Sequence, residues 1–304
     1  MSAVARQKRD ISGWLILDKP FDMTSTQAVG RVRWLFGAKK AGHAGTLDPL
    51  ATGLLPIALG EATKTVPLVQ DGTKVYRFSI GWGTETSTDD AEGEVTQRSE
   101  HRPEEAAVLA ALPAFTGEIM QTPPAFSAIK IAGERAYDLA RAGETVTLSP
   151  RPVFIETLRL VAHTAERSEF EMSCEKGTYV RALARDLARL LGTFGHVVEL
   201  RRTRVGPFDV DAAVTMAQLE AAERREDLLR PVAAGLSEIP ELQLLPPQAE
   251  AVRHGNAVLL PGAGAPLQLD IAFASFRGQP VAIGEVRSGQ FHPSRVFTAG
   301  FEEP

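Results

Sequence analysis

The chain has 304 residues, of which 44% are hydrophobic and 23% charged, as is typical of a folded globular protein. No stretch approaches the roughly 20 apolar residues of a membrane-spanning helix, and Asp18 and Lys19 interrupt the apolar run after the basic N-terminus, so we expect neither a membrane span nor a secretory signal. Cys174 is the only cysteine, which excludes an intrachain disulfide and a cysteine-based zinc cluster. A cytoplasmic enzyme fits this composition best.

The net charge of −5 argues mildly against a nucleic-acid partner, but the charge is unevenly distributed. Two segments are basic: residues 1–40 contain eight Lys/Arg and three Asp, and residues 176–204 contain seven Lys/Arg and two acidic residues. Residues 84–118 are acidic, with two Arg and nine acidic residues. If the two basic blocks meet in space, they form a face that can follow a phosphate backbone. Alternatively, all three stretches are solvated surface that pairs internally, and charge alone favours this second interpretation.

The first half of the chain alternates short strands with helices. GWLIL at 13–17 predicts a buried strand, and Thr24-Ser25-Thr26 supplies an N-cap for a helix from about 26 to 36 that Gly37 ends. The glycine-rich stretch 41–60 predicts a structured loop containing the apolar segment LLPIAL. Three further elements are expected: a strand at 74–82, an acidic turn at 84–94 and a helix at 103–112.

The second half begins with residues 118–150, which contain Pro123-Pro124 and a short basic helix and predict an insertion. A β-hairpin is expected from strands near 153–162 and 168–174. Apolar residues at the helical period predict a helix at 179–191, and another is expected at 216–228. Prolines between 231 and 247 mark a boundary, and the last ~60 residues predict a small all-β module.

Familiar cofactor and metal motifs are missing. The sequence has no GxxxxGK[ST], no GxGxxG after a strand, no HExxH and no GxSxG, and its six His are dispersed. We therefore expect no cofactor and no metal ion. The unusual stretch is residues 42–53, GHAGTLDPLATG, where Asp48 is the one carboxylate in a loop of small and apolar residues. Such an Asp is either a turn residue or a nucleophile aimed into a cleft, and spacing alone favours the turn.

Six segments, in order, resemble the bacterial tRNA pseudouridine-55 synthase family. The most specific is KKAGHAGTLDPLATGLLPIALGEATK at 39–64, which is similar to the family signature; the others are GWLILDKPFDMTS (13–25), KVYRFSIGWGTETSTDDAEG (74–93), QTPPAFSAIKIAGERAYDLARAG (121–143), KGTYVRALARDLARLLG (176–192) and LRRTRVGPF (200–208). Departures are few: Phe21-Asp22 stands where a glycine usually follows the Lys-Pro pair, and Trp82 where Leu is common.

The resemblance implies an α+β fold. Its catalytic domain, residues 1–239, would be built on a mixed, largely antiparallel sheet flanked by helices, with an RNA-gripping insertion at about 118–150. Residues 240–304 resemble the small C-terminal PUA-like RNA-binding module of the family more loosely. The implied reaction breaks the N1–C1′ bond of the T-loop uridine of tRNA, position 55, turns the uracil and rejoins it through C5.

The resemblance also assigns roles to particular residues. It makes Asp48 the nucleophile, leaving open attack at C1′, attack at uracil C6, or action as a base at the sugar, and it pairs Arg181 with Asp48 as the second catalytic residue. Substrate contacts are implied for His43, Tyr76, Tyr179, Leu200 and Lys64, with Tyr76 stacking on the extruded uracil. Core packing explains Tyr76, Tyr179 and Leu200 equally well without the resemblance. Asp90 is as consistent with a turn as with a site role, and a solvated basic stripe is expected for Arg185 and Arg189.

Two functions remain open. In the first, the chain is an RNA-modifying isomerase acting on tRNA, a cytoplasmic monomer that needs no protein partner. In the second, it is an RNA-binding chaperone that remodels the tRNA elbow, with catalysis secondary. An intact Asp48, Tyr76 and Arg181 favours the enzyme. A related family that modifies rRNA under guide RNAs has a similar loop, but the insertion and the short C-terminal module argue against it.

Overall fold

The computed structural model describes residues 8–127, 130–131, 134–135, 148–262 and 264–298. Its larger sheet has ten strands: β1 (Gly13–Lys19), β2 (Ala41–His43), β3 (Thr52–Leu59), β4 (Lys74–Trp82), β7 (Gly117–Gln121), β10 (Arg151–His163), β11 (Arg167–Cys174), β12 (Gly195–Val205), β13 (Phe208–Asp209) and β14 (Val214–Thr215). The strand order is β14-β1-β3-β12-β4-β11-β10-β7, with β2 paired to β3 and β13 to β12. Only the β1–β14 and β12–β3 pairs are parallel, so the expected mixed, largely antiparallel sheet is confirmed.

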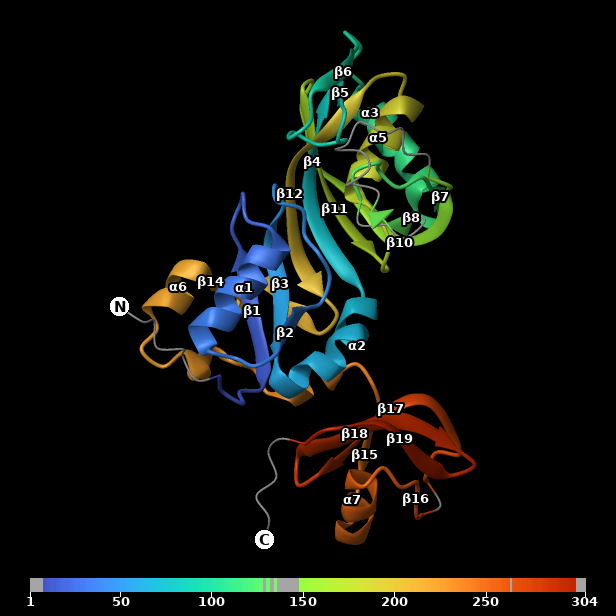
Figure 1. The fold of residues 1–304 in the computed structure, drawn as a ribbon. Coiled ribbons are helices and arrows are strands. Elements are labelled where there is room, and N and C mark those ends of the chain that lie inside the picture. Colours follow the sequence, from blue (N-terminus) through green and yellow to red (C-terminus); the bar gives the residue numbers. More distant parts are fainter. Residues whose placement is uncertain (1–7, 128–129, 132–133, 136–147, 263, 299–304) are drawn as a thin grey trace, which may run out of the picture.

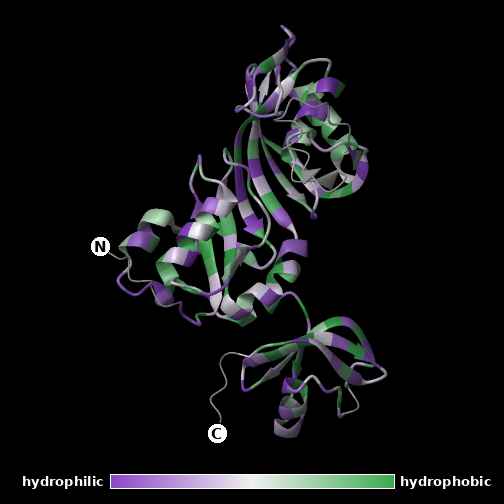
Figure 2. Cartoon of the chain, viewed as in Figure 1, coloured by the Kyte–Doolittle hydropathy of each residue, from purple (hydrophilic) through white to green (hydrophobic). Residues whose placement is uncertain are grey.

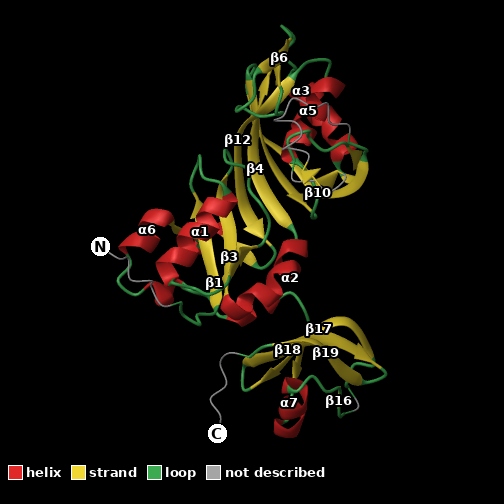
Figure 3. Cartoon of the chain, viewed as in Figure 1, coloured by secondary structure: helices red, strands yellow, loops and turns green. Residues whose placement is uncertain are grey.

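Helices and short turns flank this sheet (Figures 1 and 3). The helices are α1 (Ser25–Phe36), α2 (Val66–Asp71), α3 (Glu105–Ala111), α5 (Val180–Leu190) and α6 (Met216–Ala221), with 3-10 turns η1 (Gly60–Thr65), η2 (Leu112–Phe115), η3 (Val210–Ala212), η4 (Arg225–Leu228) and η5 (Val232–Leu236). Two hairpins pair β5 (Thr84–Thr86) with β6 (Val95–Arg98), and β8 (Lys130–Ile131) with β9 (Glu134–Arg135). Residues 128–129, 132–133 and 136–147 of the predicted insertion at 118–150 lie outside the described residues.

Local sequence signals explain where α1 begins and ends. Thr24 caps the helix by accepting from the Gln27 backbone N–H, and the Gln27 side chain accepts from the Thr24 backbone in return, which forms a capping box. Gly37 takes the left-handed conformation at φ 62° and stops the helix. Asp22 also has a positive φ, 59°, which explains why glycine suits this position.

The predicted strands at 13–17 and 74–82, the hairpin at 153–174 and the helix at 179–191 are all present. The helix predicted at 216–228 is wrong: α6 stops at Ala221 and the chain resumes as the 3-10 turn η4. Ala222 is extended, and the Arg225 side chain donates to the Leu219 and Glu220 carbonyls that a continuing helix would have used.

A narrow seam divides the larger sheet into two halves. β3 and β12 meet at only two register pairs, Arg201 with Thr52 and Arg202 with Gly53, whereas β12 pairs with β4 over most of its length. β4 and β12 run from the middle of the molecule to the upper part, where α3 and α5 lie (Figure 1). In the middle, β1 and β3 are mostly hydrophobic (Figure 2), which agrees with their nearly continuous burial.

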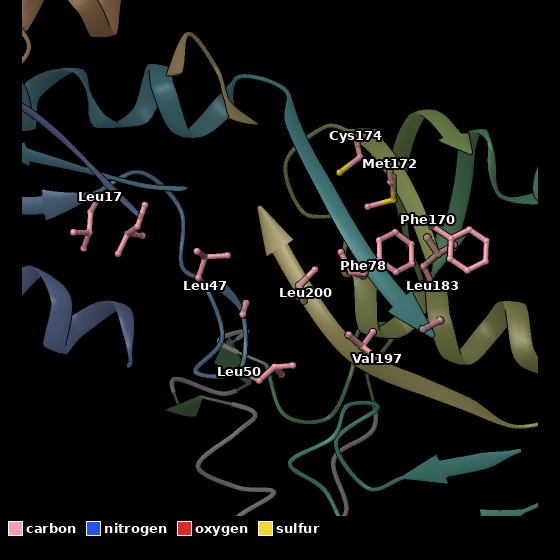
Figure 4. Close-up of a cluster of buried hydrophobic side chains, with 14 of the residues drawn as sticks. Leu17, Leu47, Leu50, Phe78, Phe170, Met172, Cys174, Leu183, Val197 and Leu200 are labelled. Atoms are coloured by element: carbon pink, nitrogen blue, oxygen red, sulfur yellow. The ribbon is translucent and has the colours of Figure 1, made fainter. Parts of the chain in front are cut away.

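One hydrophobic cluster crosses this seam. It contains Leu17 on one side, Phe78 and Leu183 on the other, and Leu47 and Leu50 of the loop between β2 and β3 (Figure 4). The loop is therefore anchored by apolar side chains that face both halves.

The C-terminal residues form a second sheet, as the predicted β-rich module requires. Its five strands are β15 (Glu241–Gln243), β16 (Val258–Leu259), β17 (Gln268–Phe276), β18 (Gln279–Arg287) and β19 (Gln290–Val296), in the order β15-β17-β18-β19-β16. The helix α7 (Pro246–Arg253), which was not predicted, packs on this sheet. Phe297 and Ile283 join Leu236 and Leu68 in a cluster that connects the module to the rest of the chain. The domain division at 239/240 itself stays a prediction. None of the described helices is both long and apolar enough to cross a membrane.

Candidate active site

Asp48 lies in the loop between β2 and β3, and this loop is fixed by several hydrogen bonds. The Leu47 backbone N–H donates to Ser25 Oγ at 2.9 Å, and Ser25 Oγ donates to the Leu47 carbonyl at 3.0 Å. The Ala44 N–H donates to the Pro56 carbonyl, and the Ala51 N–H donates to the Asp48 carbonyl at 3.1 Å. The backbone on both sides of Asp48 is thus held before any substrate binds.

Two buried cations hold further carbonyls of the same region. Lys19 is fully buried, and its Nζ donates to the carbonyls of Pro20, Met23 and Pro49, the residue after Asp48. Burial lowers the pKa of Lys19 to about 8, although Asp48 opposes this.

Arg202, 1% exposed, donates from Nε to the Leu54 carbonyl at 2.9 Å and from Nη2 to the Gly45 carbonyl at 2.9 Å, while Nη1 reaches the Thr46 carbonyl at 3.4 Å. The Arg202 fork therefore fastens the loop to β12. Gly53 makes this close approach possible, because its φ is 94° and a Cβ there would lie 2.2 Å from the Arg202 carbonyl oxygen.

Arg181, in the first turn of α5, reaches Asp48 from the other half of the sheet. Its Nε lies 2.9 Å from Asp48 Oδ2, and its side chain is 5% exposed. Nη1 donates to the Thr88 carbonyl at 3.0 Å and lies 3.3 Å from Asp90 Oδ2, while Nη2 donates to the Phe126 carbonyl at 2.9 Å. The structure thus brings Asp48 and Arg181 together, as expected, and gives every nitrogen of the guanidinium a fixed acceptor.

Asp90 serves the turn and the site at once. Its Oδ1 accepts from the Thr88 hydroxyl and from the Glu92 backbone N–H at 3.0 Å, and its carbonyl accepts from the Thr86 hydroxyl. Its Oδ2 remains for Arg181. The two alternatives left open for Asp90 are therefore compatible.

The charges around Asp48 oppose one another. Burial raises the pKa of this carboxyl and the Asp90 carboxylate adds to the effect, whereas Arg181 and Lys19 lower it. About a third of the side chain, 35%, is still accessible. Asp48 is thus a poorly solvated carboxyl group whose ionised form is favoured by Arg181, and part of its side chain is exposed.

Tyr76 and Leu200 lie on the neighbouring strands β4 and β12. Tyr76 is opposite Arg202 in register and is half-buried against the main core. Burial raises the pKa of its phenol, and the Asp48 carboxylate contributes in the same direction, so the phenol and this carboxylate act on each other. Leu200, 7% exposed, is opposite Phe78 and faces the apolar cluster (Figure 4).

Tyr179 and His43 belong to different halves of the structure, at the start of α5 and at the end of β2. Tyr179 is the N-cap of α5; the Gln121 side-chain amide accepts from its backbone N–H at 2.8 Å and donates to its carbonyl at 3.1 Å. The Arg151 guanidinium lies 5.2 Å from the Tyr179 ring centroid. His43 ends β2, and burial together with Arg202 lowers the pKa of its imidazole, which favours the neutral ring.

The structure does not bring Lys64 together with these residues. Its Nζ donates to Glu61 Oε2 at 2.7 Å and to the Val296 carbonyl at 2.8 Å, and it lies 5.9 Å from the Phe297 ring centroid. Glu61 Oε2 also accepts from the Thr298 backbone N–H at 2.6 Å. Lys64 therefore ties η1 to the C-terminal module, and the prediction that it contacts the substrate has no support in this geometry.

The basic block at 176–204 pairs internally, as charge alone had favoured. Arg185 and Arg189 bind Asp89 and Glu85 of the acidic stretch, which explains the opposite charges of the two segments. The remaining basic residues of the block are also engaged: Lys176 with Asp71, Arg181 with Asp48, Arg201 with Asp18, Arg202 with carbonyls and Arg204 with Glu238. The solvated stripe expected at Arg185 is wrong, since its side chain is only 11% exposed.

Sequence reasoning missed Lys19 and Arg202 as residues that build the site. In the sequence Lys19 only interrupts an apolar run, which gives no sign that it is buried. For Arg202 a signal exists: alternation from the buried Leu200 places Arg202 on the same, inward side of β12. A charged residue at an inward position predicts a buried partner, but the sequence does not reveal which loop supplies that partner.

Comparisons with known proteins agree with this arrangement. The family model described as TruB family pseudouridylate synthase (N terminal domain) matches residues 33–180, and that of the tRNA pseudouridylate synthase B C-terminal domain matches residues 181–237. The tRNA pseudouridine synthase B of Agrobacterium fabrum is 56% identical over 300 residues, covering 95% of this chain and 95% of the relative. The enzyme of the same name from Brucella anthropi is 54% identical over 318 residues, covering 97% of this chain and 98% of the relative.

Solved structures resemble the whole fold at lower identity. A Cbf5-Nop10-Gar1 complex contains a chain with a TM-score of 0.72 and 26% identity, covering 94% of this chain and 85% of that one. A chain in an H/ACA RNP bound to a substrate RNA containing 2'-deoxyuridine has a TM-score of 0.73 at 24% identity, with the same coverage. These likenesses support the α+β fold and its C-terminal β module.

Proposed function

The chain belongs to the TruB family of pseudouridylate synthases, and we propose that it isomerises the T-loop uridine of tRNA, position 55, to pseudouridine with Asp48 as the nucleophile. The observation that carries this proposal is the Asp48–Arg181 pair: a reactive-type carboxylate, partly open, on a loop fixed from both halves of the sheet. A turn-forming Asp would not need a buried guanidinium from a distant helix.

The reaction itself needs no external reductant or energy source. The N1–C1′ bond breaks, the uracil turns, a C5–C1′ bond forms, the C5 proton leaves and N1 ends protonated, so substrate and product have the same atoms. An ionised carboxylate can hold the intermediate by attack at C1′ or at C6, or can act as a base at the sugar. In each route Asp48 must be ionised, and Arg181 favours that form.

A base within folded RNA must leave its stack before it can react, which costs a few kcal/mol that a fitted pocket recovers. Tyr76, whose phenol pKa is raised by burial and also by the Asp48 carboxylate, would offer the ring on which the extruded uracil stacks. Leu200 and Tyr179 would line the pocket and exclude water from the intermediate. His43, held neutral, would contact RNA near the target nucleotide as a hydrogen-bonding group rather than as a charge.

The remaining contacts with tRNA fall to other parts of the chain. The RNA-gripping role is proposed for residues 118–150, of which 128–129, 132–133 and 136–147 lie outside the described residues. The C-terminal module would hold another part of the tRNA, in an orientation that the Lys64–Glu61 contacts help to set. We further propose that the protein acts as a monomer in the cytoplasm without an obligatory protein partner.

The test is an in vitro modification assay. Purified protein is incubated with an unmodified tRNA transcript, and pseudouridine is mapped by carbodiimide primer extension. Pseudouridine at the T-loop uridine alone is the expected result, in EDTA as well as in magnesium. A tRNA that is bound but left unmodified at every uridine, in both conditions, would contradict the proposal and favour the RNA-chaperone alternative.

A further inference from the structure

Arg181 and Arg185 lie one turn apart on α5 and bridge the same two segments. Arg181 binds the Thr88 carbonyl of the turn 88–90 and the Phe126 carbonyl of the segment 121–126. Arg185 binds the same pair of segments: Nη1 donates to Asp89 Oδ2 at 3.0 Å and Nη2 donates to the Thr122 carbonyl at 2.8 Å.

Arg185 is built into the fold rather than solvated. Its Nε donates to Asp186 Oδ1 at 2.8 Å, so all three guanidinium nitrogens have acceptors, and its side chain is 11% exposed, as is that of Asp89. Asp89 takes a positive φ of 60° to present its carboxylate there. Residues other than glycine adopt this conformation rarely, although Asp does so more often than most.

The next arginine on the same helix face provides a contrast. Among the residues that the structure describes, Arg189 donates to Glu85, at 2.7 Å, and its side chain is 54% exposed. It makes no described contact with the segment 121–126. Arg185 and Arg189 thus lie on the same helix, carry the same charge and each bind one acidic residue of the stretch 84–94, but only Arg185 links the two segments.

We propose that Arg185 is a positioning residue for the catalytic pair. By clamping the turn 88–90 to the segment 121–126, it fixes the two carbonyls that hold the Arg181 guanidinium against Asp48. The inference rests on the proposed function, since it gives Arg185 a role through Arg181 and Asp48. Arg185 itself touches neither the nucleophile nor, in this account, the RNA.

The consequence is a loss in turnover rather than in RNA binding. When the clamp loosens, Thr88 and Phe126 no longer define one position for Arg181, so the guanidinium spends less time on Asp48. Interactions needed in the transition state weaken, which lowers kcat, while KM for tRNA stays nearly constant.

The pH dependence of kcat provides a second measurement of the loosened contact between Arg181 and Asp48. Less contact with Arg181 leaves Asp48 less stabilised as an anion, so the acid limb of kcat moves to higher pH. The other groups that act on Asp48 are Asp90 and Lys19, and Glu92 and Tyr76 feel its charge in turn. None of these groups is altered in an Arg185 variant, but Asp89 is affected: burial raises its pKa to about 6 and Arg185 lowers it, so weakening Arg185 raises this pKa and protonation of Asp89 loosens the same clamp.

The experiment compares Arg185→Lys with Arg189→Lys in the full-length protein. Both substitutions keep the positive charge, but Lys has a single nitrogen and cannot replace the fork that joins Asp89 to Thr122. For Arg185→Lys we expect kcat to fall about tenfold, equivalent to ~1.4 kcal/mol, with little change in KM and an upward shift of the acid limb. Arg189→Lys should match the wild type.

A second variant guards against a folding defect. Asp89→Asn leaves an acceptor for Arg185 but removes its charge, and it should lower kcat in the same direction by a smaller factor. If Arg185→Lys equals Arg189→Lys in kcat and pH profile, or raises KM alone, the inference is overturned. In that case an active wild type still upholds the proposed function, whereas a wild type that modifies no tRNA refutes that function.

Discussion

Replacing Arg202 with Met should destabilise the protein far more than the same change at Arg201. Arg202 is 1% exposed, and its guanidinium is the donor for the carbonyls of Gly45 and Leu54, with Thr46 within reach. Met has a similar apolar stem but no donor, so these carbonyls lose their partner in a region where little water can replace it.

The magnitude follows from this loss. A buried acceptor left unsatisfied costs about 1–3 kcal/mol, and bonds from charged donors lie at the upper end. Two good bonds and one long one, all to neutral carbonyls, therefore predict a loss of about 3–5 kcal/mol. Arg201 holds Asp18 by two bonds, but the side chains are 39% and 24% exposed, so its replacement should cost about 1 kcal/mol.

Urea unfolding followed by far-UV circular dichroism measures both variants. The midpoint should fall strongly for Arg202→Met and slightly for Arg201→Met, with the slope unchanged in both. Equal shifts in the two variants, or a loss below ~1 kcal/mol for Arg202→Met, would refute the view that this guanidinium supports the Asp48 loop.

Three further predictions concern the site, the turn before α1 and the C-terminal module. Because burial raises the pKa of Asp48 and the reaction needs its anion, kcat should be lost as pH falls through a value above 3.8. Arg181→Met removes the group that lowers this pKa, so it should move the acid limb of the kcat profile to still higher pH. An acid limb that stays in place would contradict the pairing of Asp48 with Arg181. Asp22→Gly should raise the free energy of unfolding by about 0.5–1 kcal/mol, seen as a higher Tm, because Asp22 has a φ of 59°; an unchanged or lower Tm would count against strain there. Lys64→Met should leave kcat unchanged and lower the free energy of unfolding by about 1 kcal/mol, because Lys64 binds Glu61 and the Val296 carbonyl. A large fall in kcat with normal stability would instead indicate that Lys64 contacts the substrate.

Elements with strong local signals were predictable from the sequence. The helix from Ser25 has a capping box and a glycine stop, and the strand at 74–82 alternates well enough from Tyr76 onward, so each needed no tertiary information. The predicted helix at 216–228 failed because its second half has no apolar face to bury, and Arg225 captures the carbonyls at the end of α6 instead.

The candidate site was predictable only in part. The resemblance pointed to Asp48 and Arg181, which the fold does bring together, but it also pointed to Lys64, whose bonds lie with Glu61 and the C-terminal module. Sequence position does not reveal which of several cations a fold will bury. Arg185 shows the same limit. Its position on the helix suggested a solvated stripe, but the fold brings Asp89 and Thr122, which are distant in sequence, into hydrogen-bonding contact with it.

The most direct test of the central claim is a single-turnover measurement with Asp48→Asn, which keeps the size of the side chain and removes its charge. Enzyme in excess over tRNA gives the rate of pseudouridine formation, and filter binding gives the Kd for the same RNA. The account predicts a rate at least ~10³-fold lower, because the nucleophile is gone, with tRNA binding preserved within a few fold. Pseudouridine formation at a rate near that of the wild type would show that another group carries the reaction.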